Sequence, residues 1–215
     1  MFPPENLNLF PQNVFRAPDR VTFHEEAARE AGFSIIAGVD EVGRGPLAGP
    51  VVAAAVILPE SPLLPGVKDS KLMTPKSREE AFEAIRFEAL SAAVGVVSRA
   101  YIDRFNILKA SLEAMARAVR SLDPQPEFLL VDGIYPVSLP IPQQCLKKGD
   151  QVSLSISAAS VVAKVYRDRI MTAYHDVFPA YGFAQNKGYG TPQHLEALKK
   201  YGPSPIHRLT FRRVL

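Results

Sequence analysis

The chain has 215 residues and 47% of them are hydrophobic, which suits one large domain with a sizeable core and argues against global disorder. Its single cysteine, Cys145, excludes an intramolecular disulfide and a cysteine-based zinc site, and the net charge of +3 permits a polyanionic partner without requiring one. The sequence shows neither a long apolar run of the membrane-spanning kind nor a secretory signal pattern, so we expect a cytoplasmic protein.

The first 32 residues are expected to form an arm and a short helix. Residues 1–20 are rich in proline and lack periodicity, which is typical of an extended arm. Thr22 and Glu25 have the spacing of a capping box, and this predicts a helix that stops at Gly32.

Two strands are predicted next, over residues 33–39 and 51–58, on either side of a turn rich in glycine and proline. The second strand is apolar throughout, so both of its faces should be covered. Because the two strands follow each other closely, they are expected to pair antiparallel.

The following residues show alternating helix and strand patterns. Thr74 and Pro75 form an N-cap and first-turn pair that predicts a helix. The further elements expected are a strand at 93–98, a helix at 101–122, a strand at 128–131, an edge strand at 144–146, and helices at 153–177 and 192–201.

This order favours a mixed-sheet α/β fold. We expect this α/β domain to occupy residues 33–178. Residues 179–215, which are mostly helix and loop, are expected to form a lid or small C-terminal region.

Asp40 and Glu41 stand where the first apolar strand ends. Two charges at the end of a buried strand are costly unless they are compensated, and a divalent cation compensates two neighbouring carboxylates well. The alternative is a pair of surface charges at a turn.

The turn that follows, Gly43-Arg44-Gly45, can expose backbone N–H groups to an anion because glycine permits positive φ and close approach. Arg44, between two glycines, has little to pack against and is free to contact a phosphate.

Other acids stand at comparable positions. Asp132 ends the strand at 128–131, at the edge where functional groups gather in open α/β sheets, although an Asp-Gly pair can also simply start a turn. Asp150 precedes the long helix and is a further candidate acid, or merely begins the turn into it. Asp168, on that helix beside Arg167 and Arg169, competes for this role, but an ion-paired structural role suits it better.

Two more residues suggest contacts with nucleic acid. Tyr189 lies between glycines, where a ring can stack on a sugar or base or can pack over its own turn. Lys71 precedes a helix start and can hold a phosphate, or can be an ordinary surface charge. His194 and His207 lack the clustered partners of a zinc site, and neither a nucleophile elbow nor a P-loop is present.

Several carboxylates without clustered histidines or cysteines select a hard cation, Mg²⁺ or Mn²⁺. Such sites typically run metal-assisted phosphodiester hydrolysis.

Seven blocks of the sequence resemble bacterial ribonuclease HII in order and spacing, from residue 34 to 211. They are GVDEVGRGPLAGPVVAAAV, VKDSKLMTPKSRE, VDG, KKGD, SAASVVAKVYRDRIM, YGFAQNKGYGTPQHLEAL and PSPIHRLTF. The related ribonuclease HIII type has a different turn after the Asp-Glu pair and a platform domain in front, and neither is seen here.

The resemblance implies a ribonuclease H-like mixed sheet flanked by helices. It implies cleavage of the RNA strand of RNA–DNA hybrids and cutting 5′ of single ribonucleotides in duplex DNA, leaving 3′-hydroxyl and 5′-phosphate ends. By the same resemblance, the metal-binding and catalytic acids are Asp40, Glu41, Asp132 and Asp150. The triplet Gly43, Arg44 and Gly45 reads the ribose 2′-hydroxyl and its phosphate, and Tyr189 stacks on the neighbouring sugar.

Two alternatives remain on the same fold: a DNA-directed nuclease and a non-catalytic hybrid-binding protein. Nothing in the sequence suggests an obligate interface, so we expect a monomer.

Overall fold

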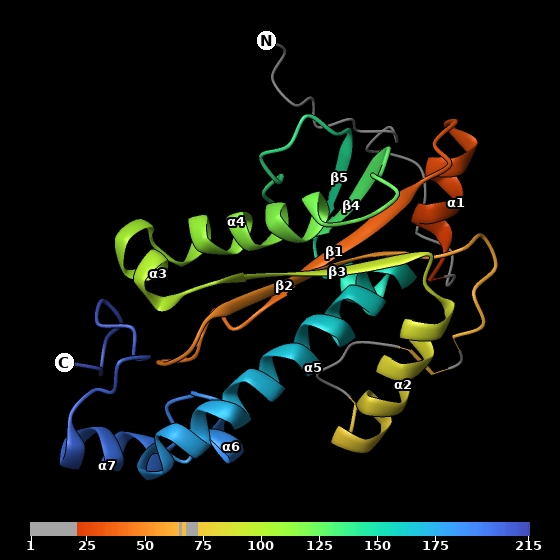
Figure 1. Cartoon of the computed structure of the whole chain (residues 1–215). Helices are drawn as coiled ribbons and strands as arrows, with labels where there is room; N and C mark the ends of the chain where they lie inside the picture. Colours follow the sequence, from red (N-terminus) through yellow and green to blue (C-terminus); the bar gives the residue numbers. More distant parts are fainter. Residues whose placement is uncertain (1–20, 65, 68–72) are drawn as a thin grey trace.

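The structure is a computed structural model that describes residues 21–64, 66–67 and 73–215. Its centre is a five-stranded mixed sheet with the strand order β3-β2-β1-β4-β5 (Figure 1). The strands are β1 (Ile36–Val42), β2 (Val51–Ile57), β3 (Ser91–Val97), β4 (Phe128–Asp132) and β5 (Gln143–Leu146). The pairs β1–β2 and β2–β3 are antiparallel, and the pairs β1–β4 and β4–β5 are parallel. The expected mixed sheet and the early antiparallel pair are confirmed, and β5 lies at the edge as predicted.

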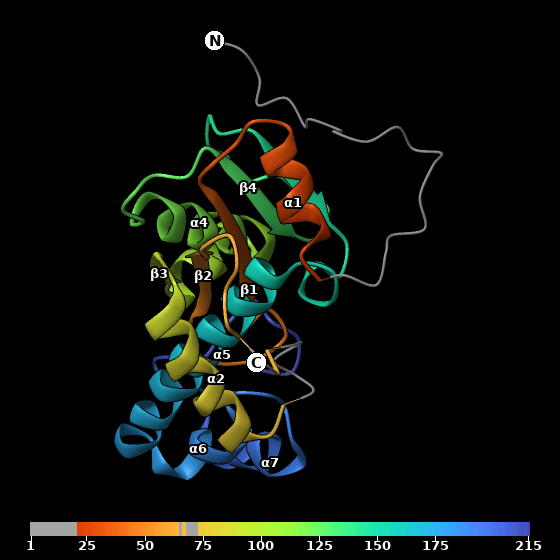
Figure 2. The ribbon, with the colours of Figure 1, turned by 90° about the vertical axis from the view of Figure 1, so that its right-hand side faces the viewer.

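Helices cover both faces of the sheet (Figures 1 and 2). One face carries α4 (Ile107–Arg120), with α3 (Arg99–Phe105) before it; the other carries α5 (Leu154–Val177), α2 (Pro75–Glu88) and α1 (Phe23–Glu30). Alternate residues of β2 enter different cores, since Ala53 and Ala55 pack with α4 while Ala54 and Val56 pack with α2 and α5. This double coverage explains why β2 is apolar throughout.

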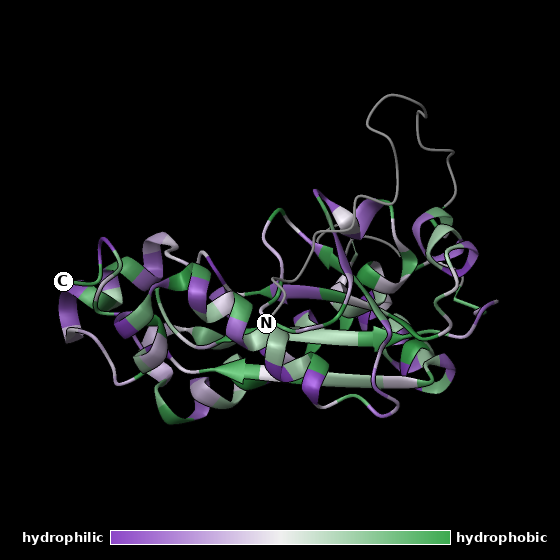
Figure 3. Cartoon of the chain, turned by 90° about the horizontal axis from the view of Figure 1, so that it is seen from above, coloured by the Kyte–Doolittle hydropathy of each residue, from purple (hydrophilic) through white to green (hydrophobic). Residues whose placement is uncertain are grey.

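The helices present apolar stripes to the sheet and polar stripes to solvent. Figure 3 shows the helices banded in purple and green, whereas the sheet includes long stretches of strand that are green to white. None of the helices in the described ranges is both long enough and apolar enough to cross a membrane.

The long helix α5 lies unusually close to β1. A Cβ atom placed on Gly38 would lie 2.1 Å from the backbone carbon of Ser155, closer than real Cβ atoms come to backbone. Glycine at this position therefore lets the first turn of α5 rest on the strand. The same contact brings α5 against Asp40, two residues further along the same face.

The C-terminal region contains a 3₁₀ helix at Pro179–Tyr181, then α6 (Phe183–Asn186) and α7 (Pro192–Tyr201). These lie together at the end of the molecule reached by the last turns of α5 (Figure 2). Their apolar side chains share a core with Met171 of α5 and with Leu47 and Ala48, which follow the glycine-arginine-glycine turn. The helix predicted at 192–201 is confirmed, while the two short helical turns before it were not predicted.

Two expectations about helix ends are wrong. The predicted helix at 101–122 is two helices, because Asn106 adopts a positive φ of 75° and its side chain caps α4 through the Lys109 N–H. The capping box of Thr22 and Glu25 does not form. Glu25 is buried and instead accepts hydrogen bonds from the Ser153 hydroxyl and from the Ser155 hydroxyl and N–H, 2.6–2.9 Å away, at the start of α5.

Strand bounds also differ from the prediction. The first strand runs over Ile36–Val42, so Asp40 and Glu41 lie inside it, paired with Ala54 and Ala53 of β2. The helix predicted after Thr74 is α2, which ends at Glu88, and Leu90, two residues further on, is exposed.

Candidate active site

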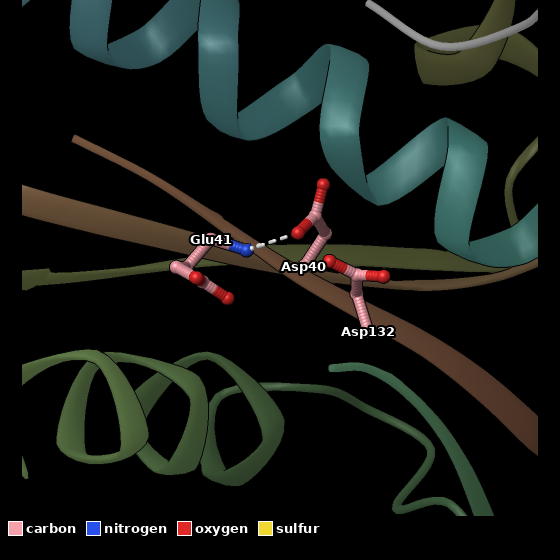
Figure 4. A group of neighbouring side chains, drawn as sticks. All are labelled: Asp40, Glu41 and Asp132. Carbon is pink, nitrogen blue, oxygen red and sulfur yellow. Dashed lines mark hydrogen bonds between the residues drawn. The ribbon is translucent and has the colours of Figure 1, made fainter. Parts of the chain in front are cut away.

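Three carboxylates meet at the ends of β1 and β4. Asp40, Glu41 and Asp132 each offer one oxygen such that these oxygens all lie within 4.8 Å of one another. Figure 4 shows the Asp40 side chain pointing toward α5 and the Glu41 side chain on the other side of the strand, with Asp132 beside them. Because β1 and β4 are adjacent and parallel, their acids arrive at the same edge of the sheet.

Asp40 is the most buried of the three, with 4% of its surface exposed. One of its oxygens accepts the Glu41 N–H at 2.7 Å. Burial, followed by the charges of Glu41 and Asp132, raises the pKa of Asp40 well above its usual range, although hydrogen bonds from Ser160 and from the backbone oppose this. A bound cation would therefore stabilise the ionised form of this site.

Glu41 lies on the α4 side of the strand. Burial raises its pKa, and Arg44, whose Nη1 donates to Glu41 Oε1 at 3.3 Å, opposes that rise. Arg44 is half-exposed and pairs with this acid, so its side chain lies beside the carboxylates and stays accessible from solvent. A cavity of about 220 Å³ opens here, lined by Glu41, Arg44 and Asp132 together with Ser111 of α4 and Tyr135.

Asp132 is linked to the segment that carries Asp150. The Gly149 N–H donates to Asp132 Oδ1 at 2.7 Å, and Asp150 follows in the 3₁₀ helix Gly149–Gln151. Asp150 is buried, and its main-chain carbonyl accepts the Ser157 hydroxyl at 2.6 Å. Its carboxylate does not belong to the group of three acids that meet within 4.8 Å in the described part of the chain.

Asp168 lies further along α5 and is ion-paired. Its oxygens lie 2.6 Å from Lys164 Nζ and 3.7 Å from Arg78 Nη1. The ion-paired role expected from the sequence agrees with this, but the partners are not the flanking arginines. Arg167 donates to main-chain carbonyls, and Arg169 pairs with Glu79.

The turn after the acids has two different glycines. Gly43 has a φ of +98°, and a Cβ there would lie 2.3 Å from Nε of Arg167, so both conformation and packing require glycine. Gly45 has no positive φ, and its Cα faces the ring of Tyr189, where a Cβ would lie 3.7 Å from Cε1. The structure thus brings Tyr189 beside the turn from more than a hundred residues away. Lys71 lies outside the described residues.

Two residues outside the predicted site residues support the acids and the turn. Ser160 bonds the Asp40 carboxyl, and it belongs to a polar stripe on α5, with Ser157, Lys164 and Asp168, whose regular spacing is a usable signal. Arg208, fully buried, bonds the carbonyls of the turn, and nothing local in the sequence marks it.

The acids suit a divalent cation. All the converging atoms are carboxylate oxygens, the donor type that hard cations prefer. Arg44 is the only cationic side chain paired with the three acids among the described ion pairs, so their negative charge is not balanced by the protein. The buried Ser111 Oγ, which lines the adjacent cavity, has no hydrogen-bond partner among the described residues and suits a bound ligand or water.

Comparison with known proteins identifies the family. Residues 37–214 match the profile of the family described as Ribonuclease HII. The ribonuclease HII of Geobacter sulfurreducens is 57% identical over 192 residues, which cover 89% of this chain and 88% of that protein. The ribonuclease HII of Geotalea uraniireducens is 52% identical over 210 residues, covering 98% and 96%.

Solved structures have the same architecture. The crystal structure of ribonuclease H2 from Pyrococcus horikoshii superposes with a TM-score of 0.74 at 29% identity, covering 84% of this chain and 95% of that one. Bst-RNase HIII, solved in complex with Mn²⁺, has a TM-score of 0.65 at 21% identity over 87% of this chain and 70% of that one, which shows a shared fold.

The ribonuclease H-like fold expected from the sequence is thus confirmed, and the three converging acids fit the divalent metal expected with it. The family match spans the sheet, α5 and the C-terminal region, and bacterial relatives share more than half of the aligned residues along most of their length. The chain therefore belongs to the ribonuclease HII family.

Proposed function

We propose that this ribonuclease HII cuts the RNA strand of RNA–DNA hybrids, and cuts 5′ of single ribonucleotides in duplex DNA, with Asp40, Glu41, Asp132 and Asp150 as its metal-binding acids. The observation that carries the proposal is the group of three carboxylates, one buried and two partly buried, whose oxygens lie within 4.8 Å of one another beside a turn that has exposed backbone. The hydrogen bond from the Gly149 N–H to Asp132, which links the short helix of Asp150 to one of these acids, supports including Asp150.

Mg²⁺ or Mn²⁺ held by these acids would lower the pKa of an attacking water and stabilise the departing oxygen. Hydrogen bonds within the protein orient the acids for metal binding. Ser160 and the Glu41 N–H fix the orientation of Asp40, the Gly149 N–H fixes Asp132, and Arg44 restrains Glu41. In the hydrolysis, water attacks phosphorus and the 3′-oxygen of the preceding nucleotide leaves, so the ends are a 3′-hydroxyl and a 5′-phosphate.

Selectivity for RNA is assigned to the turn and to Tyr189. The 2′-hydroxyl is the group that distinguishes RNA from DNA, and the exposed Arg44 and Gly45 stand next to the acids, where this group would lie. The half-exposed ring of Tyr189 faces Gly45 and can stack on the adjoining sugar. Contacts to backbone and sugar carry no base information, so cleavage should depend little on sequence.

The test is cleavage of a DNA duplex carrying one ribonucleotide, in the presence of Mg²⁺, with analysis of both new ends. We expect a single cut 5′ of the ribonucleotide, and a loss of at least ~10³-fold in rate for Asp40→Asn, because neutralising one acid removes charge that the cation needs. Cleavage no faster than that of the variant would refute the enzyme proposal. Cleavage of an all-DNA duplex at the same rate would instead favour the DNA-directed nuclease.

The fourth acid is tested by comparing Asp150→Asn with Asp168→Asn. We expect Asp150→Asn to lose roughly 10²-fold or more in kcat, since it is the proposed ligand. Asp168→Asn should keep most activity and lose about 0.5–1 kcal/mol of stability through its ion pairs. If Asp168→Asn abolishes turnover while it remains folded, and Asp150→Asn is mild, the assignment is reversed.

The protein is further proposed to act as a monomer in the cytoplasm. The single, half-buried cysteine suits a reducing compartment. Light scattering during size-exclusion chromatography, at a concentration near that of the assay, measures the mass directly; a dimeric mass would contradict the monomer.

A further inference from the structure

Arg208 lies fully buried beneath the glycine-arginine-glycine turn, and its side chain bonds only main-chain carbonyls among the described residues. A guanidinium has five N–H donors, and here each one has an acceptor. The acceptors are the carbonyl oxygens of Gly49 at 3.0 Å, Arg44 at 3.0 Å, Pro46 at 2.8 Å, Gly43 at 2.5 Å and Pro50 at 3.2 Å.

The charge of Arg208 is retained although the residue is buried. Burial lowers its pKa to about 9, which is still above neutrality. The described ion pairs include none with Arg208, so the carbonyl dipoles compensate the charge, with Asp103 acting from a distance. The ring of Phe211, whose centroid is 5.0 Å from Cζ, packs on the guanidinium. Removing such a group takes a donor from five carbonyls, of which only Pro50 keeps a second donor among the described residues, Arg167, so the turn depends on Arg208.

The bonds of Arg208 also determine where the N–H groups of the turn point. In a trans peptide the C=O of one residue and the N–H of the next point in opposite directions. When Arg208 binds the carbonyls of Gly43 and Arg44, the N–H groups of Arg44 and Gly45 are directed away from it. Neither N–H takes part in a hydrogen bond within the described part of the chain, and both residues are exposed.

We infer that Arg208 is a positioning residue for recognition of the ribonucleotide: it holds the turn so that the N–H groups of Arg44 and Gly45 face the substrate. This inference rests on the proposed function, because it assigns a support for the turn that is proposed to read the 2′-hydroxyl. Among the described hydrogen bonds and ion pairs Arg208 has none with the three acids, so it acts on the site through the turn.

A second buried arginine provides a matched control. Arg167 is also fully buried and donates to carbonyls, but its acceptors are Ala48, Pro50 and Lys187. It bonds neither the Gly43 nor the Arg44 carbonyl. Replacing each arginine by lysine keeps the charge and much of the stem while it removes the fork, so both variants lose stability for the same reason.

The experiment measures discrimination as a ratio of dissociation constants. Fluorescence anisotropy, with Mg²⁺ and in the Asp40→Asn background to prevent cutting, gives Kd for an all-DNA duplex and for the same duplex with one ribonucleotide. We expect Arg208→Lys to reduce the preference for the ribonucleotide about tenfold, the loss that about 1.4 kcal/mol of hydrogen bonding corresponds to. Arg167→Lys should keep the preference within about twofold.

A second measurement separates the turn from the acids. This measurement uses protein in which Asp40 is intact. Mn²⁺ should raise the Tm of Arg208→Lys by as much as that of the parent, because the acids that would bind the ion lie on β1 and β4 and not on the turn. A merely structural role would alter both the Tm shift and the affinity for all-DNA duplex. If Arg208→Lys does not fold, Phe211→Leu, which removes the packed ring but keeps the five donors, should reduce the preference in the same direction.

Each outcome decides the question. If the parent protein shows no preference for the ribonucleotide, the proposed function fails, whatever Arg208 does. If the parent discriminates and Arg208→Lys (or Phe211→Leu, where Arg208→Lys is unfolded) discriminates equally well, the inference alone fails. Equal losses of the preference for the ribonucleotide in Arg208→Lys and Arg167→Lys also overturn the inference, because a general loss of packing around the buried arginines would then explain the effect.

Discussion

At the scale of single residues, the protein places carboxylates where they destabilise it. Asp40 is buried, and its pKa is raised by burial and by two neighbouring acids. A fold that keeps such a residue sacrifices stability for a function that needs negative charge. In the absence of metal, the effect of each acid on the free energy of unfolding can therefore be measured by replacing it.

We expect Asp40→Asn to stabilise the protein by about 1–2 kcal/mol in the presence of a chelator at pH 7, because it removes a buried charge and keeps an oxygen to accept the Glu41 N–H. Urea unfolding measures this. Asp168→Asn is the control, since its carboxylate is ion-paired and its loss should destabilise. A chelator-treated Asp40→Asn that is less stable than the parent would contradict this interpretation of the site.

The two histidines dismissed as zinc ligands form a chain of hydrogen bonds. The Ser204 N–H donates to His207 Nδ1 at 2.9 Å, so the proton of neutral His207 lies on Nε2 and points to His194 Nε2, 2.9 Å away. His194 must then carry its proton on Nδ1, which donates to the Tyr189 carbonyl at 2.8 Å. This chain supports the loop that carries Tyr189, and it requires both rings to be neutral.

The pH dependence of stability follows from this. Burial lowers the pKa of both rings, that of His207 to about 4, whereas in the unfolded chain it is 6.5. The folded state therefore binds fewer protons below pH 6.5, and stability is complete above about pH 7 and falls as the pH drops toward 4. Between pH 7.5 and 5, we expect His207 alone to cost roughly 2 kcal/mol, since one pKa unit corresponds to about 1.4 kcal/mol.

Urea unfolding across this range tests the prediction with His207→Gln as the comparison. The variant should show a weaker dependence on pH, whatever its stability at pH 7.5. His24, whose pKa burial also lowers, titrates in both proteins and cancels in the difference. Parallel curves for the two proteins would show that His207 does not titrate as proposed.

At the scale of elements, the site depends on how closely α5 approaches β1. Gly38 permits that approach, and Asp40 lies on the same strand face. Gly95 has the equivalent role on the other face, where a Cβ would lie 2.0 Å from the Ala114 carbonyl of α4. The two glycines differ in position. Gly38 lies on β1, the strand that carries Asp40 and Glu41, whereas Gly95 lies on the edge strand β3.

We expect Gly38→Ala to destabilise the protein by roughly 2–3 kcal/mol and to lower kcat well beyond the loss of folded protein, because the helix must move away from Asp40. Gly95→Ala should cost similar stability with kcat nearly unchanged. Chemical denaturation and single-turnover cleavage, measured on the same preparations, separate the two effects. Equal losses of kcat in both variants would contradict a specific role for the contact between α5 and β1.

At the scale of the whole molecule, the C-terminal region is joined to the sheet by its core and by buried arginines. Leu47 and Ala48 pack with Tyr181, Phe183 and Ile206, and Arg208 bonds the turn from within the same region. These contacts connect residues far apart in sequence, so the region should not unfold separately.

We therefore expect calorimetry to show one cooperative transition, which Mn²⁺ moves upward as a whole by a few degrees, as binding to the native state alone requires. In Asp40→Asn the shift should be largely lost. A separate early transition, shown by hydrogen exchange to come from residues 179–215, would mean that this region is an independent unit.

The sequence alone determined much of the fold and the site. Apolar runs and their ends predicted all five strands, because strand periodicity is local. The carboxylates of Asp40 and Asp132 stood out because charge at the end of an apolar strand is costly. The turn at Gly43 was recognisable because glycine is required there, and the resemblance of seven motifs indicated the family.

Only the tertiary structure decided which of these residues meet. Glu25 fitted a local capping box, yet its partners are Ser153 and Ser155, because a buried carboxylate takes the donors that packing brings to it. Arg208 bonds carbonyls more than 150 residues away, and Tyr189 faces Gly45 across a similar separation. Local spacing carries no information about contacts between residues so far apart in the chain. The role of Arg208 in supporting the turn could therefore be identified only from the tertiary structure.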